Sequence, residues 1–260
     1  MCWSGEASGV LAVVGLSTAA YVAIKQGESK ELWIPLTYFA LMELLQAVTY
    51  IYIDLCDNPS NQILTLLGYI HVAFQPFFVN MVAMYFIPVS VKLKIRTTVY
   101  TICAIGSIYT ICAIGSIAML IKMYPFGWAG SCHIGVEGFC GPSVCSTSGS
   151  WHIAWQMPLN GLMSDPVKWL GGFDWGLHAF TYIAVAFYMP FIYGSYRFVG
   201  FHYLIGPLIS DITTTDPNEY AAVWCLFSIA LCISVIKTPI RKYLHVKKWF
   251  FYKPEIGDSL

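Results

Sequence analysis

The sequence predicts an all-helical protein that crosses a membrane several times. Hydrophobic residues make up 57% of its 260 residues, charged residues only 11%, and the mean hydropathy is +0.64. Soluble domains carry about 25% charged residues, so this chain has too few to cover a water-soluble core. Its aromatic and aliphatic content also excludes disorder. Basic and acidic residues number 14 each, which argues against nucleic acid as a partner. The expected partner is the lipid bilayer.

Seven apolar segments are candidates for membrane spans, since a transmembrane helix needs about 20 mostly apolar residues. The fifth segment is short and carries His152, Gln156 and Asn160, so a re-entrant segment is the alternative there. The predicted spans are residues 8–25, 31–53, 62–89, 97–121, 148–164, 172–196 and 219–240, and a basic tail, 241–260, follows them.

The positions of lysine and arginine predict the orientation, because cytoplasmic loops collect these residues. With seven spans and the N-terminus outside, 12 of the 14 basic residues fall inside, and only Lys122 and Arg197 fall outside. A re-entrant fifth segment would place the basic tail outside. We therefore expect the N-terminus outside and the C-terminus in the cytoplasm. No cleavable signal peptide is expected, because no charged region precedes the first apolar segment.

Five cysteines fall on the outer side in this topology, and none falls in the inner loops. This distribution predicts disulfides in an oxidising compartment, whether extracellular, periplasmic or lumenal. The pairing stays open, and one cysteine must remain unpaired or bond to another chain, as in a homo-oligomer. A metal site with His133 is the alternative, although the spacing matches no common zinc motif. The candidates are Cys2, Cys56, Cys132, Cys140 and Cys145.

A short polar motif occurs twice. HVAFQP covers His71–Pro76, HIAWQMP covers His152–Pro158, and Asn80 and Asn160 follow the two copies. In a helix, His and Gln at i and i+4 share one face, and each proline frees a backbone carbonyl. Such helices build ion and ligand sites near the membrane midplane. The alternative is that these side chains only form hydrogen bonds between helices.

Glu43 is the only acidic residue deep in a predicted span. A carboxylate at that depth either carries a proton or pairs with a cation. His71 lies at a similar depth in the next span, and Gln46 follows Glu43 by nearly one turn. A Glu43–His71 pair could hold a proton, a cation or a polar head group. The predicted ligand-binding residues are Glu43, Gln46, His71, Gln75, Asn80, His152, Gln156 and Asn160.

These residues predict a binding or transport protein with a central polar pocket for a small polar ligand, a cation or a proton. The first alternative is a metal-dependent intramembrane enzyme with Glu43, His71 and His152 as ligands. Carboxamides are poor metal ligands, so the repeated Gln favours hydrogen bonding instead. A retinal protein with its Schiff base at Lys237 is disfavoured, because no carboxylate precedes that lysine by one turn. A structural membrane subunit is the last alternative. No catalytic residue is assigned.

Four segments resemble an uncharacterised family of multi-span membrane proteins with about seven helices. They are the opening Met-Cys-Trp-Ser, the AFQP and WHIAW segments, and PNEYAAVWCLFSI at residues 217–229. The resemblance covers most of the chain and implies no function. The seven-span hydrolases that hold zinc with three histidines, of the alkaline ceramidase and adiponectin-receptor type, are similar in span number and intramembrane histidine. Their late His-x3-His pair is missing here.

Overall fold

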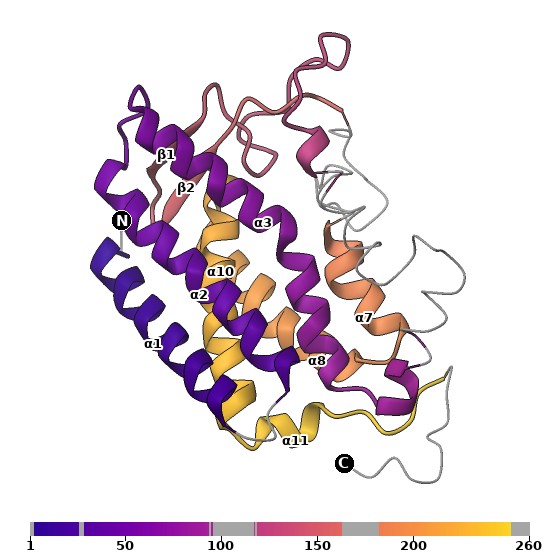
Figure 1. The fold of residues 1–260 in the computed structure, drawn as a ribbon. Coiled ribbons are helices and arrows are strands. Elements are labelled where there is room, and N and C mark those ends of the chain that lie inside the picture. The colour runs from indigo at the N-terminus through magenta and orange to yellow at the C-terminus, as the bar shows by residue number, and fades with distance from the viewer. Residues whose placement is uncertain are drawn as a thin grey trace.

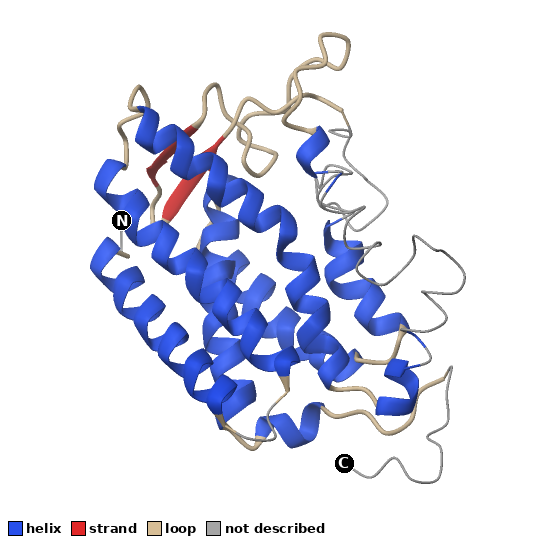
Figure 2. Cartoon of the chain, in the orientation of Figure 1, coloured by secondary structure: helices blue, strands red, loops and turns tan. Residues whose placement is uncertain are grey.

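Helices dominate the described part of the chain, and a β-hairpin lies at one end of the bundle (Figure 2). The computed structural model describes residues 3–25, 29–93, 95, 117, 119–162 and 182–250. The elements in chain order are α1 (Gly5–Ile24), α2 (Lys30–Thr49), η1 (Tyr50–Tyr52), α3 (Pro59–Tyr85), β1 (Cys145–Ser148), β2 (Ile153–Gln156), η2 (Ala184–Tyr188), α7 (Met189–Ile192), α8 (Tyr196–Tyr203), η3 (Leu204–Leu208), α9 (Ile209–Thr213), α10 (Pro217–Lys237) and α11 (Ile240–Leu244).

Four of the described helices are long and apolar enough to cross a membrane. They span Gly5–Ile24, Lys30–Tyr52, Pro59–Tyr85 and Pro217–Ile236, and they coincide with the first, second, third and seventh predicted spans. Most of the fourth predicted span and the first part of the sixth lie outside the described residues, as do Cys2 and the end of the tail.

The predicted span at 148–164 is wrong as a helix. Residues 145–156 form an antiparallel hairpin in which Cys145 pairs with Gln156 and Ser148 with Ile153. The sequence between these strands, Gly149–His152, makes the turn. The segment contains enough apolar residues to suggest a helix, but serine, threonine and glycine favour a turn and extended strands here. Pro158 and Gly161 then oppose any helical continuation.

The long helices begin at polar residues that cap them. Ser4, Ser29, Asn58 and Asp216 each accept a hydrogen bond from a backbone N–H in the first turn. Proline occupies the first helical position of α3 and α10, where its missing N–H costs nothing. These caps fix where the apolar helices start.

Helix α2 lies between α1 and α3 and also packs against α10 (Figure 1). Small residues let α1 approach α2 closely, as is common in membrane bundles. A Cβ atom added at Gly15 would lie 2.7 Å from the Cβ of Ala40, and one at Gly5 would lie 2.9 Å from the Cβ of Tyr50. Only glycine therefore fits at these two positions without movement of α1.

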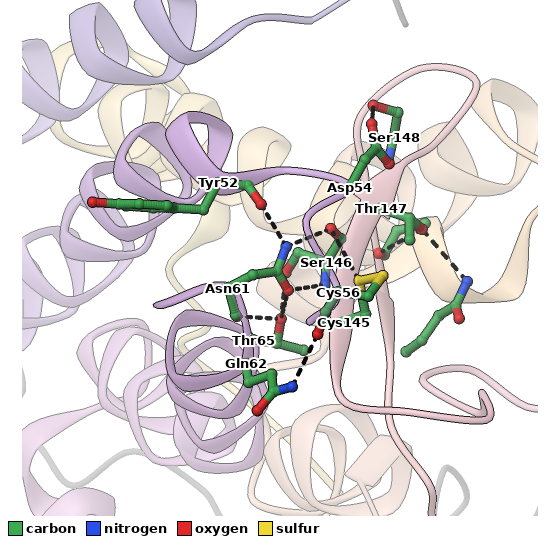
Figure 3. The surroundings of a disulfide bond; sticks show 12 residues. Tyr52, Asp54, Cys56, Asn61, Gln62, Thr65, Cys145, Ser146, Thr147 and Ser148 are labelled. Carbon is green, nitrogen blue, oxygen red and sulfur yellow. Dashed lines mark hydrogen bonds between the residues drawn. A yellow bond between two sulfur atoms is a disulfide. The ribbon is translucent and has the colours of Figure 1, made fainter. Parts of the chain in front are cut away.

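The hairpin is fixed at its first strand to the start of α3 (Figure 3). Cys145 forms a disulfide with Cys56. The Asn61 amide donates to the Ser146 carbonyl at 2.9 Å and accepts from the Ser146 N–H at 2.8 Å, and the hydroxyls of Thr65 and Ser146 lie 2.7 Å apart. The hairpin is thus a fixed part of the bundle, and we call the end that carries it the cap end.

A second disulfide, Cys132–Cys140, closes a short loop at the same end. Together with Cys56–Cys145 it accounts for four of the five predicted outer cysteines. A buried ion pair supports this loop, with Lys122 Nζ 3.1 Å from Glu137 Oε2. Disulfides are therefore present where the sequence predicts them.

The opposite end of the bundle carries α11 and the residues that follow it (Figure 1). The Val246 N–H donates to the carbonyl of Phe86, just after α3 ends, at 2.9 Å. We call this end the tail end. Helices α1, α3 and α10 run from the cap end to the tail end, and α2 runs back.

Two substitutions on α1 test the close contact with α2. Gly15→Ala places a methyl group against Ala40, whereas the new Cβ of Gly9→Ala meets nothing nearer than Ala47 Cβ at 3.9 Å. Both gain about 1 kcal/mol of helix propensity, but overpacking at Gly15 costs about 1–3 kcal/mol. Thermal unfolding in detergent should give a Tm several degrees lower for Gly15→Ala than for Gly9→Ala. Equal Tm values would mean that α1 is not seated as described.

Candidate functional site

One face of α2 carries three polar side chains at spacings of three and four residues. Glu43, Gln46 and Tyr50 therefore lie one above another towards the cap end. Glu43 and Gln46 are fully buried. Neither oxygen of Glu43 and neither polar atom of the Gln46 carboxamide has a hydrogen-bond partner within the described chain. Buried polar atoms are nearly always paired, so these four atoms are exceptions that call for an explanation.

Helix α1 forms one wall of this site. Ser8 is fully buried and lies next to the Glu43 carboxyl group. Its hydroxyl accepts a hydrogen bond of 2.7 Å from the indole N–H of Trp3. The small residues of α1 allow this approach, because they bring the two backbones together.

His152, in the turn of the hairpin, lies at the cap end of the site. Its ring is fully buried, and its Nδ1 lies 3.0 Å from the Tyr50 hydroxyl. The backbone N–H of Ile153 donates to the same nitrogen at 2.8 Å. Nδ1 is therefore an acceptor, and the proton of the neutral ring belongs on Nε2. Nε2 is buried and has no partner among the described residues, so it offers an unused donor.

Burial keeps this imidazole neutral. Desolvation lowers the pKa of His152 from 6.5 to about 3, because the charged ring loses its hydration. The ring does not take up a proton as the pH falls from 8 to 5. Any pH dependence of the site in that range must come from another group.

Glu219 holds the hairpin turn in place over the site. This buried residue lies in the first turn of α10. Its Oε1 accepts from the backbone N–H groups of Trp151, at 2.5 Å, and His152. Its Oε2 accepts from the hydroxyls of Ser150, at 3.0 Å, and Thr214, at 2.5 Å. Hydrogen bonds to an ionised acceptor are about twice as strong as neutral ones, which makes Glu219 the main attachment of the turn.

The sequence reasoning missed Glu219, Tyr50, Ser8 and Trp3. The only local signal at Glu219 is its place three residues after the N-cap Asp216, which is typical of a capping box. That pattern predicts a hydrogen bond from the Glu219 side chain to the start of its own helix, whereas the carboxylate accepts from N–H groups of the hairpin. A contact across the chain leaves no trace in local spacing.

His71 is not part of this cluster. Its ring stacks on Tyr38 of α2 at 3.8 Å, and the Tyr38 hydroxyl donates to the His71 carbonyl at 2.5 Å. No ion pair within the described chain joins His71 to Glu43. Its Nε2 is buried without a partner, as is that of His152. The structure thus brings Glu43 together with Ser8 and Gln46, and places His71 beside Tyr38.

Gln75 and Asn80 connect α3 to other helices. Tyr182 donates to Gln75 Oε1 at 2.7 Å, and Gln75 Nε2 lies 2.8 Å from the Cys225 sulfur. Asn80 donates to the Val185 carbonyl at 2.9 Å and accepts from Tyr193 at 3.0 Å. These side chains have their hydrogen-bond partners within the protein. They therefore behave as the alternative interpretation of the motif expects, in which they only join helices.

The second copy of the polar motif does not repeat the first in space. The first copy is helical, whereas His152 precedes a strand and Gln156 ends it. Gln156 is half-buried and lies 3.4 Å from the Thr147 hydroxyl. Asn160 donates to the carbonyls of Ile121 and Tyr124, at 2.8 Å and 2.7 Å. The prediction that His152 and Gln156 share one face of a helix is therefore wrong.

The predicted metal ligands Glu43, His71 and His152 are not gathered into one cluster. Across the described ranges, no three His, Cys, Asp or Glu side chains are arranged to hold a metal ion. The side chain of Lys237, the candidate retinal attachment, lies outside the described part of the chain.

Fold and site together define a helical protein with apolar helices long enough to cross a membrane, a disulfide-linked cap and a buried polar cluster beneath it. The chain belongs to DUF5765, a family of unknown function, whose match covers residues 6–245. This agrees with the resemblance to an uncharacterised family. No curated protein and no solved structure matches the chain.

Replacing Glu219 tests whether its charge holds the hairpin. Glu219→Gln keeps the size but can accept at one atom only, so donors at the turn lose a partner. We expect the free energy of unfolding to fall by about 2–4 kcal/mol, since hydrogen bonds to charged groups contribute about 1.5–3 kcal/mol each. Hydrogen exchange at Trp151 and His152 should accelerate strongly.

The matched control is Glu6→Gln, which neutralises an exposed glutamate at the same end of the bundle. It should leave hydrogen exchange in the hairpin at the wild-type rate. Equal protection in all three proteins would show that the disulfide and strand β1 suffice to hold the turn.

Proposed function

We propose that this is a multi-pass membrane protein that binds a small cation, the proton included, in the polar cluster formed by Glu43 and Gln46. The observation that carries the proposal is the set of unpartnered atoms on two fully buried side chains. Leaving such atoms unmatched is costly. A bound molecule that satisfies them would recover that cost.

The chemistry of the cluster favours a cation or a small cationic solute. Glu43 supplies two oxygens, and Gln46 and Ser8 supply oxygens on either side of it. A membrane-buried carboxyl group either keeps a proton or pairs with a positive charge. Gln46 and the Nε2 of His152 add N–H donors, which could orient a solute that carries acceptors as well. Transport or sensing would follow from the same binding step.

The site would lie in the outer part of the membrane. Glu43 precedes Tyr50 by seven residues, which is about 10 Å along a helix. Tyr50 contacts the hairpin, so the cluster lies about two turns beneath the cap. The hairpin covers the cluster at the cap end, where Glu219 and the Cys56–Cys145 disulfide hold it.

A metal-dependent hydrolase finds less support. Zinc enzymes need three protein ligands around one ion, and His71 stacks on Tyr38 away from the Glu43 cluster. Hydrogen bonding and charge pairing by Glu43 therefore carry the proposal.

The topology we propose keeps seven crossings with the N-terminus outside, but changes their positions. Residues 196–213 run as α8, η3 and α9 without a break and would cross in place of 148–164. One end contacts the tail end, where Arg197 donates to Tyr243 and His245, and Thr214 at the other contacts Glu219. Eighteen helical residues span about 27 Å. In this topology Arg197 joins the inner basic residues and Lys168 moves to the outer side, so 12 of the 14 basic residues still fall inside, as the charge rule requires.

Labelling from outside tests this topology. Ile192, which is 53% exposed, would face the cytoplasmic side, whereas a span that ends at residue 196 would bring it outside. A cysteine at Ile192 should resist a membrane-impermeant maleimide on intact cells and react after permeabilisation. Asp57→Cys at the cap end is the positive control. Labelling of Ile192→Cys on intact cells would contradict the proposed crossing.

Replacing Glu43 tests the binding site. Protein in nanodiscs is melted in choline chloride with lithium, sodium, potassium or methylammonium added, and separately across pH 5–8. A ligand at 100 times its Kd adds about 2.7 kcal/mol, so wild type should show a saturable rise in Tm with one cation or with protons. Glu43→Gln keeps the shape and should abolish this rise.

Glu6→Gln serves as the control here too, because it removes an exposed charge from α1 and should respond as wild type does. An identical cation and pH response in wild type and Glu43→Gln would refute Glu43 as the binding group.

A further inference from the structure

The chain after α10 does not leave the bundle but crosses its tail end. Residues 238–250, which we call the strap, include α11 and pass beneath the end of α3 (Figure 1). Leu244 and Val246 are buried, with 5% and 3% of their surface exposed, and the Val246 N–H donates to Phe86 at 2.9 Å. These contacts hold the strap against the protein.

Two further contacts fix its position. Arg197 Nη1 donates to the carbonyls of Tyr243 and His245 at 3.0 Å and 3.1 Å. The Trp249 indole donates to the Ile192 carbonyl at 3.0 Å, and its ring stacks on Tyr196 at 4.8 Å. The strap is therefore attached to the bundle at its middle and near its end.

The outward side chains are cationic and aromatic. Lys242, Lys247 and Lys248 are exposed, and none of them forms an ion pair with a described residue. Tyr243 and Phe250 are exposed by 74% and 93%. The sequence has no acidic residue from 220 to 254. The exposed face of the strap therefore carries positive charge with no carboxylate within it.

We propose that this face binds the headgroups of anionic phospholipids in the leaflet next to the tail end. Lysines just beyond a membrane helix attract anionic lipids, and each contributes roughly a fivefold preference. Aromatic rings such as Tyr243 and Phe250 favour the same interfacial depth. A soluble acidic partner would not need two exposed rings beside the lysines. The inference rests on the membrane placement proposed above and is independent of the Glu43 site.

The test measures lipid preference around the full chain. Wild-type protein is placed in phosphatidylcholine vesicles with spin-labelled phosphatidylglycerol or spin-labelled phosphatidylcholine, and the immobilised fraction is compared by electron spin resonance. The triple variant Lys242→Gln, Lys247→Gln, Lys248→Gln should reduce the preference for phosphatidylglycerol by at least about tenfold, given roughly fivefold per lysine. High salt should reduce it in wild type as well.

The corresponding triple Lys→Arg variant is the matched control, because it keeps the charge and should keep the preference. An unchanged preference in the Gln variant, or one in wild type that persists at high salt, would overturn the proposal. Glu43→Gln should leave lipid preference unchanged, and the strap variants should leave the cation response unchanged, so the two proposals fail separately.

Discussion

The attachment of the hairpin to α10 through Glu219 determines how the cap and the bundle fit together. One buried carboxylate accepts from two backbone N–H groups and two hydroxyls, and so joins the turn of the hairpin to the first turn of α10. Gly149 is required beside it, because a Cβ there would lie 2.7 Å from Glu219 Oε1. The position of His152 over the α2 cluster follows from this attachment, since its own N–H is one of the four donors.

Buried polar groups in this bundle fall into two sets, those with hydrogen-bond partners and those without partners within the described chain. Gln75 and Asn80 are as polar as Gln46, yet each has partners on neighbouring helices. Such bonds fix helix register and are common between membrane helices. Glu43 and Gln46 are equally buried and lack partners within the described chain. The carboxamides on α3 therefore connect helices to one another, and the difference in pairing is the reason for proposing the binding site on α2.

The four long helices of the described chain were predictable from the sequence because apolar length is a local property. The burial of Glu43 was predictable for the same reason, since an acid within an apolar segment is visible without a structure. The hairpin was not, because its stability comes from Asn61, Cys56 and Glu219, which lie far away in the chain. The His-Gln repeat gave a wrong prediction for a related reason, because similar sequences form a helix in the first copy and a strand in the second.

The walls of the polar cluster differ in how firmly they are held. The hairpin has a disulfide and charged hydrogen bonds, and 61% of the apolar window of α10 is buried. Only 28% of the corresponding window of α1 is buried, and α1 meets α2 through glycine and alanine. If the helices cross a membrane as proposed, such contacts gain no hydrophobic stabilisation over contact with lipid. Since Ser8 of α1 lies beside Glu43, the α1 side is the part of the cluster's surroundings that the rest of the bundle encloses least.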